Sequence, residues 1–207
     1  MRRHVYRIIG IMVGFLVGMG GTGFAKGSSA SIHFAGKTYI LQNSVGNSRE
    51  WLNEYLPVGE KFSSYSTMFT VRSYDALRNT PQEVASSVIY NLKQNYPDTE
   101  YSFFPGKGND AGLSFILSRP GIFEFNFFRF TTQQGHPVAL QFVYREYPQA
   151  QNEAQLRQKM IQTIKQNATI WEKELMSLPV PAIQRGAKNP AKAPAKTQIK
   201  KLKLVKK

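Results

Sequence analysis

Four segments rich in aromatic and branched residues follow one another between residues 100 and 147, and the connections between them are very short. The segments are 100–104, 113–118, 122–131 and 138–147. Their composition is typical of β-strands. Parallel neighbours would need a crossover of about a dozen residues or more, whereas the connections here hold a few Gly, Pro, Asn and Gln residues. The sequence therefore predicts an antiparallel meander.

A helix is predicted to begin at Thr80. Thr80 is suited to the N-cap, Pro81 to the first helical position, and Glu83 completes a capping box three residues after the cap. Apolar residues then recur at helical spacing, and the pattern ends at Tyr96 before Pro97. The apolar face comprises Val84, Ala85, Val88, Ile89, Leu92 and Tyr96. A helix with one apolar face needs a sheet to cover.

A second, longer amphipathic helix is predicted over 150–178. Its apolar residues recur every three or four positions and are Leu156, Met160, Ile164, Ala168, Trp171, Leu175 and Leu178. We expect this helix to lie across the sheet or to pair with the first helix.

The first part of the chain predicts two more strands, 37–42 and 65–74. Between them, the spacing of four apolar residues predicts a helical turn or two before Pro57; these are Trp51, Leu52, Tyr55 and Leu56. The predicted fold class is therefore α+β, a mainly antiparallel sheet of about six strands packed with two principal helices, in one domain over 26–183.

Positive charge is concentrated at the two ends of the chain. Of the 27 Lys and Arg residues, three precede Val13 and nine follow Gln184, where there is no acidic residue. The remaining 15 basic residues are nearly balanced by all 13 acidic residues. The formal net charge of +14 therefore belongs to the ends, and it does not make the body a nucleic-acid-binding domain.

The N-terminal end has the layout of a secretory signal peptide over 1–25. Basic residues precede an apolar run at 8–19, and small residues lead to a cleavage position after Ala25. The apolar run is shorter than the ~20 residues that span a bilayer. We expect export to the periplasm, with an extracellular location as the alternative; retention of the segment as an anchor stays open.

The C-terminal end, Gln184 to Lys207, is rich in Lys, Ala and Pro, and we expect it to be disordered because it offers little apolar surface to bury. In an exported protein this basic tail is expected to bind an anionic envelope surface, such as phospholipid, lipopolysaccharide or cell-wall polymer, and not nucleic acid. The residues expected to do so include Lys196, Lys200, Lys201, Lys203, Lys206 and Lys207. The alternatives are a passive solubilising tail and, for 199–205, a short segment that folds onto a partner.

Residues for catalysis and metal binding are sparse. The chain has no Cys, which excludes thiol chemistry, disulfides and iron–sulfur clusters. After signal cleavage only His33 and His136 would remain, without a metal-ligand spacing, and no nucleotide-binding or hydrolase motif is present. We therefore predict no catalytic residues, no metal and no cofactor.

One polar group in the last hairpin is a candidate ligand site. If 134–135 forms a two-residue turn, Glu124 falls opposite Arg145 and Asn126 opposite Val143. Glu124, Asn126 and Gln141 or Arg145 would then form a polar patch among phenylalanines. One interpretation is the floor of a ligand pocket, with Arg145 binding a carboxylate or phosphate. The other is a cross-strand ion pair on the less buried face of the sheet.

Most aromatic residues are expected in the core, because they alternate along strands or lie on helix faces. Trp51, Tyr55 and Tyr65 are the better candidates for an exposed partner surface.

The order of elements, together with two short strings at 53–60 and 124–130, resembles small secreted bacterial proteins with a PsbP-like α/β sandwich. The resemblance covers roughly residues 35–178. It implies a non-enzymatic accessory protein and carries over no catalytic residues. Together with the export signal, it predicts a periplasmic accessory protein that binds another envelope component, with a role in secretion, envelope assembly or host interaction. The alternative is a periplasmic protein that binds a small ligand or peptide in an aromatic and polar pocket on the sheet.

Overall fold

The computed structural model describes residues 30–119, 122–147 and 152–186. In this part of the chain it contains eight strands and two α-helices. The first four strands are β1 (Ser31–Phe34), β2 (Lys37–Gly46), β3 (Trp51–Pro57) and β4 (Thr67–Ser73). Helix α1 (Pro81–Asn95) follows, then β5 (Tyr101–Pro105), β6 (Ala111–Arg119), β7 (Ile122–Gln133), β8 (His136–Glu146) and α2 (Glu153–Ser177).

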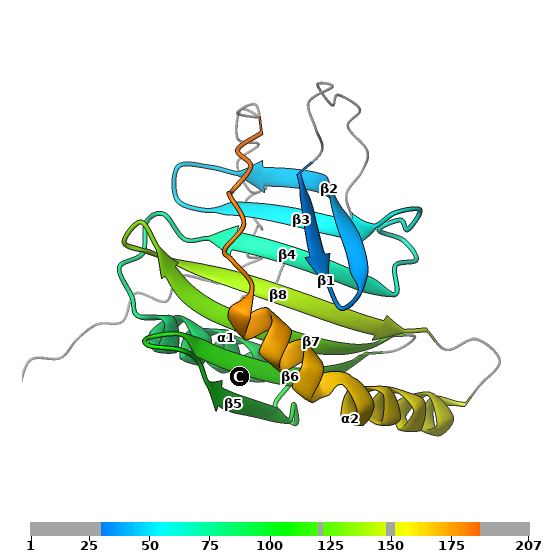
Figure 1. Cartoon of the computed structure of the whole chain (residues 1–207). Helices are drawn as coiled ribbons and strands as arrows, with labels where there is room; N and C mark the ends of the chain where they lie inside the picture. Colours follow the sequence, from blue (N-terminus) through cyan, green and yellow to red (C-terminus); the bar gives the residue numbers. More distant parts are fainter. Residues whose placement is uncertain (1–29, 120–121, 148–151, 187–207) are drawn as a thin grey trace, which may run out of the picture.

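The strands form one antiparallel sheet in the order β1-β2-β3-β4-β8-β7-β6-β5 (Figure 1). The predicted meander from β5 to β8 is confirmed. The pairing of β4 with β8 joins the N-terminal strands to this meander, so the two halves of the chain share one sheet. The α+β class with a mainly antiparallel sheet is thus confirmed.

The predicted number of about six strands is wrong, because β1 and β3 were not expected. The segment predicted to be a helical turn is strand β3. Trp51 and Tyr55 are four residues apart, and this spacing places two side chains on the same face of a strand and also on the same face of a helix. Pairing with β2 on one side and β4 on the other decides for the strand, in which Trp51, Asn53 and Tyr55 are buried on the same face.

The two helices cover opposite faces of the sheet (Figure 1). Helix α1 packs five of its six predicted apolar residues on even-numbered residues of β7, including Phe128 and Phe130, whereas the sixth, Tyr96, is exposed. Helix α2 lies across the other face and packs on odd-numbered residues, including Phe125 and Phe127. The first alternative predicted for α2, a position across the sheet, is confirmed. In the described residues neither helix is long and apolar enough to cross a membrane.

The predicted capping box at the start of α1 is confirmed. The backbone N–H of Glu83 donates to Thr80 Oγ1 at 3.3 Å, and the N–H of Thr80 donates to Glu83 Oε2 at 2.8 Å. The Thr80 N–H, together with the Thr80 hydroxyl that donates to the same oxygen at 3.2 Å, lowers the pKa of the Glu83 carboxyl. The helix ends at Tyr96, as the Pro97 that follows predicts.

Residues 178–186, here called the C-terminal strap, run from the end of α2 over the same face of the sheet towards β2 (Figure 1, orange). Leu178, Val180 and Ile183 pack against the main core. The buried Asn53 side chain then holds Gln184, accepting from its N–H at 2.6 Å and donating to its carbonyl oxygen at 2.7 Å. The strap therefore covers the part of the sheet that α2 leaves open.

The strap changes the boundary predicted for the basic tail. Residues 184–186, expected to be disordered, are bonded to the body: the N–H of Gly186 donates to Ser44 Oγ at 3.3 Å, and Arg185 forms an ion pair with Asp75 at 2.8 Å. The physical reason is the buried Asn53 amide, which needs hydrogen-bond partners that composition does not reveal. The rest of the tail, with its lysines, and the predicted signal peptide lie outside the described residues.

Candidate functional site

The register predicted for the last hairpin is confirmed. Gln134 and Gly135 both have positive φ, 52° and 78°, as a two-residue turn of type I′ requires. Gln133 pairs with His136, and this places Glu124 opposite Arg145 and Asn126 opposite Val143. Because side chains alternate along a strand, Glu124, Asn126 and Arg145 lie on the face of the sheet that α1 partly covers.

Glu124 and Arg145 form an ion pair within the protein. Arg145 Nη2 lies 2.6 Å and Nε 3.2 Å from the same Glu124 oxygen, Oε1. The side chains of Arg145 and Glu124 are only 7% and 0% exposed. The predicted ion pair thus exists, but it is buried and does not lie on an open face. Burial removes both charges from water, a cost that the direct contact offsets.

Two tyrosines also contact Arg145. Its guanidinium carbon lies 3.9 Å from the centre of the Tyr65 ring, and Nη1 donates to the Tyr147 hydroxyl at 3.2 Å. The Tyr147 hydroxyl in turn donates to the Tyr65 carbonyl oxygen at 3.1 Å. Burial, together with the nearby Glu124 charge, raises the pKa of the Tyr65 hydroxyl. Arg145 is therefore held on its edge by hydrogen bonds and on its face by an aromatic ring.

The prediction that Trp51, Tyr55 and Tyr65 form an exposed partner surface is wrong, because all three are buried. Tyr65 covers Arg145, whereas Tyr55 belongs to the main core. Trp51 lies under Arg185 of the C-terminal strap, 5.8 Å from the guanidinium to the ring centre. These burials depend on segments distant in sequence, which the spacing of aromatic residues does not reveal.

Asn126 belongs to a separate chain of hydrogen bonds across the sheet. Gln141 Nε2 donates to Asn126 Oδ1 at 2.8 Å, and Thr70 Oγ1 donates to Gln141 Oε1 at 3.1 Å. Thr70 is also in register with Glu54, whose carboxylate accepts from Asn43 at 2.7 Å. Burial raises the pKa of the Glu54 carboxyl. We name Asn43, Glu54, Thr70, Gln141 and Asn126 the polar row.

Of the polar row, Asn126 and Gln141 were predicted to lie together, whereas Asn43, Glu54 and Thr70 were not. Glu54 interrupts a mostly apolar strand, β3, and this is a signal that could have found it, whereas β4 holds four polar residues among its seven and offers no such signal for Thr70. The strand order was also needed, since only the pairings of β8 with β4 and of β4 with β3 bring them beside Gln141.

The chemistry available to this arrangement is limited by its internal bonding. Arg145 already donates to Glu124 and Tyr147, so a ligand carboxylate would compete with both. His33 and His136 lie elsewhere, beside Thr38 and Arg78. Two shallow hollows lie along α2, and neither is lined by Glu124, Asn126 or Arg145. The geometry favours a structural ion pair, and ligand binding at these residues stays a prediction.

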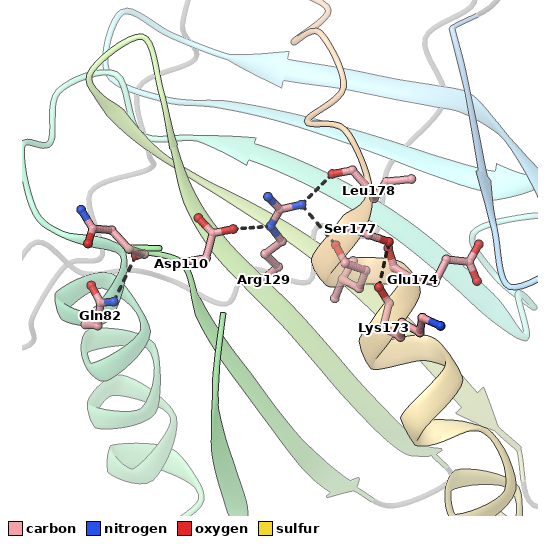
Figure 2. A network of polar contacts seen from close by, with 9 residues as sticks. Gln82, Asp110, Arg129, Lys173, Glu174, Ser177 and Leu178 are labelled. Carbon is pink, nitrogen blue, oxygen red and sulfur yellow. Dashed lines mark hydrogen bonds and ion pairs between the residues drawn. The ribbon is translucent and has the colours of Figure 1, made fainter. Parts of the chain in front are cut away.

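A second polar site, unexpected from the sequence, surrounds Arg129 on β7 (Figure 2). Arg129 Nε donates to Asp110 Oδ2 at 2.7 Å, with both side chains 12% exposed. Arg129 Nη1 donates to the carbonyl oxygens of Leu178 at 2.6 Å and Leu175 at 3.3 Å. Helix α2 has no basic residue in its last turn, so Arg129 supplies the positive charge there. The site therefore ties β7 and the β5–β6 loop to the end of α2.

The loop that carries Asp110 is also bonded to the other helix. Gln82, near the start of α1, donates to the carbonyl oxygen of Asn109 at 3.0 Å (Figure 2). Arg129 and its neighbours thus connect elements on both faces of the sheet.

Comparison with known proteins places the chain in a family. The sequence model of one protein family matches residues 27–180. The chain belongs to this family. The matched segment begins just after the predicted signal peptide and contains all eight strands and both helices of the described structure, while the basic tail lies beyond it. No curated protein matches the sequence. The resemblance to PsbP-like proteins stays a prediction.

Proposed function

We propose that this protein is an exported, non-enzymatic accessory protein of the bacterial envelope. In this proposal the folded body binds another envelope component, in support of a secretion or envelope assembly or of host interaction. The basic tail adds attachment to an anionic surface. The observation that carries the proposal is the distribution of charge: nine basic residues and no acidic residue follow Gln184, on a chain whose middle is nearly neutral.

The physical basis of attachment is the sum of several weak contacts. Each lysine near an anionic membrane contributes ~1 kcal/mol, and the attraction decays within a Debye length of about 10 Å at moderate salt. The strap supports this separation of roles, because Gln184 and Gly186 are bonded to the sheet and the described body ends at Gly186. The family match also ends at residue 180, before the tail.

Buried charged groups of the described body are bonded to other groups of the protein. Glu124 and Arg145 bond to each other, and Arg129 bonds to Asp110 and to the end of α2. This internal bonding supports a binding role for the body over an enzymatic one, since a general acid or base must reach a substrate.

The test compares the full chain with a truncation after Gly186 in co-sedimentation with vesicles of roughly 30% anionic lipid. We expect the full chain to bind at about 20 mM salt and to be released at about 500 mM, and the truncated protein not to bind at either. A tail with a scrambled order and unchanged charge is the matched control, and it should bind like the native tail. Equal binding by the full and truncated proteins would refute attachment through the tail.

Binding by the body is tested separately by affinity isolation from a solubilised envelope fraction, using the same two proteins. We expect both to recover the same envelope component, because the truncation leaves the described body intact. Recovery of no envelope protein or polymer by either protein would refute the accessory role.

A further inference from the structure

The far end of the C-terminal strap is held through its main chain. The buried Asn53 side chain bonds to both the N–H and the carbonyl oxygen of Gln184. Ser44 Oγ donates to the same carbonyl oxygen at 2.5 Å and accepts from the N–H of Gly186 at 3.3 Å. The Gln184 side chain bonds within the strap, where Nε2 donates to the Ala182 carbonyl oxygen at 3.2 Å. These contacts to the sheet would therefore accept any residue at position 184 that has a backbone N–H.

The next position is recognised by its side chain. Arg185 forms an ion pair with Asp75 at 2.8 Å, and its guanidinium lies over the ring of Trp51. An acidic group and an aromatic ring together favour a basic side chain. Two residues before Arg185, Ile183 packs against the main core. The strap is thus bound in the manner of a peptide ligand, by its backbone and by one apolar and one basic side chain.

One polar group on this face of the sheet is left without a partner. Ser73 is in register with Trp51, so both side chains lie on the face that the strap crosses. Ser73 is only 4% exposed, and no described residue forms a hydrogen bond with its hydroxyl. A buried hydroxyl without a partner is costly, so a segment that bonded to it would gain an interaction that the strap does not make. We name Ser44, Trp51, Asn53, Ser73 and Asp75 the strap site.

The first part of the strap is attached to the sheet by apolar side chains. Pro179 and Pro181 have no backbone N–H, and in the described structure residues 179–183 make no hydrogen bond to the sheet. The family match ends at residue 180, before the anchored residues 183–186. The match therefore includes the whole strap site and not the segment that fills it here.

We propose that the strap site binds an extended peptide segment of the envelope component, and that the strap occupies the site as an internal competitor. The peptide has an apolar residue two positions before an Arg or Lys, and a polar group that bonds to the Ser73 hydroxyl. The strap of a second copy would repeat the contacts seen here and leave Ser73 without a partner, so a different sequence is the better occupant. The inference rests on the proposed function, because it assigns a site to the binding ascribed to the folded body. Since the strap is tethered, its effective concentration is about millimolar, and the peptide must displace it.

The first test measures, by fluorescence anisotropy, the binding of a labelled peptide of residues 179–186 to the full chain. Gln184→Pro in the protein removes the N–H that donates to Asn53 and so weakens the internal strap. We expect this variant to bind the peptide at least ~tenfold more tightly than wild type does. Gln184→Ala keeps the N–H and is the matched control, so it should bind the peptide like wild type.

A charge reversal tests the recognition of the basic side chain. In the Gln184→Pro protein, a further Asp75→Lys substitution should weaken binding of the same peptide by ~tenfold, and a peptide carrying Arg185→Glu should restore binding to within ~threefold. Asp75 is suited to this test because its side chain is 18% exposed, whereas Asn53 is fully buried in the sheet.

The second test repeats the affinity isolation from the envelope fraction with full-length wild type, Gln184→Pro and Asp75→Lys. We expect Gln184→Pro to recover more of the envelope component and Asp75→Lys to recover less, each by ~threefold or more. An excess of the peptide of residues 179–186 should release the component from all three proteins.

Several outcomes would overturn the inference. Equal peptide binding by wild type and Gln184→Pro would do so, as would charge reversals that fail to compensate each other. Equal recovery of the envelope component by all three proteins would mean that the body binds it through another surface, and the proposed function would stand. Recovery of no component by any of them would refute the proposed function instead, and the peptide measurements would then decide on the site alone. A wild-type dimer that Asp75→Lys abolishes would also overturn the inference, since the occupant would be the strap of a second copy.

Discussion

Replacing Arg129 by leucine is expected to destabilise the protein by ~3 kcal/mol. Arg129 makes one ion pair with Asp110 and two hydrogen bonds to the last carbonyl groups of α2. Hydrogen bonds to charged groups contribute about 1.5–3 kcal/mol each, but contacts of one guanidinium are not additive, and partial exposure weakens the ion pair. For a protein of this size ~3 kcal/mol corresponds to a fall of roughly 10 °C in Tm.

The assay is urea unfolding of four proteins, namely wild type, Arg129→Leu, Asp110→Asn and the double variant. We expect the losses of unfolding free energy in the two single variants to add up to more than the loss in the double variant, by ~1 kcal/mol or more, because each substitution removes the same contact. Amide exchange should also speed up at the end of α2 in Arg129→Leu, where Arg129 bonds to the carbonyls of Leu175 and Leu178.

The control is Arg157→Leu, at an exposed position on α2, which should change stability by less than about 0.5 kcal/mol. A loss below ~1 kcal/mol for Arg129→Leu, or additivity of the two single variants, would refute the inference that Arg129 joins the β5–β6 loop to the end of α2.

Three further predictions follow from the same structure. Arg145→Ala should lower the free energy of unfolding by ~3 kcal/mol, since it removes a donor group from the fully buried Glu124 carboxylate. If a carboxylate or phosphate ligand raised the Tm of wild type and not of this variant, the result would favour the pocket interpretation instead. Thr80→Ala should cost ~1 kcal/mol at neutral pH. The Thr80 N–H and hydroxyl lower the pKa of Glu83, so the part of the cap that involves this carboxylate is present above its unfolded-state pKa and is lost as pH falls through the folded-state value. Thr80→Ala removes only the hydroxyl, so the stability difference between wild type and variant should narrow, but not vanish, in acid unfolding curves. Truncation after Gly186 should leave Tm unchanged. Truncation after Ile183 should lower the free energy of unfolding by ~1–2 kcal/mol, because it removes the hydrogen-bond partners of the buried Asn53 side chain. Equal Tm values for the two truncated proteins would contradict the role of the strap.

Much of the candidate site was predictable because its register depends on a local turn. Once residues 134 and 135 form a two-residue turn, every cross-strand pair of β7 and β8 follows by counting, including Glu124 with Arg145. Burial of this pair was not predictable. It depends on Tyr65, which precedes β4 and reaches Arg145 only because β4 lies beside β8.

The Arg129 site illustrates the same limit at longer range. Arg129 contacts Asp110, 19 residues away, and Leu178, 49 residues away. Nothing in the local sequence of β7 distinguishes this arginine from one that faces solvent. The need for a positive charge arises at the end of α2, whose own last turn has none.

The elements that could be predicted from the sequence are those with local signals. The capping box at Thr80, the apolar faces of both helices and the short connections from β5 to β8 each depend on residues within one or two turns of the chain, so pattern and stereochemistry were sufficient. Three outcomes could be learned only from the folded chain: residues 51–57 form a strand, the sheet continues from β4 to β8, and residues 184–186 pack on the body. These outcomes depend on hydrogen-bond partners supplied from distant parts of the chain, and such partners exist only once the sheet has formed.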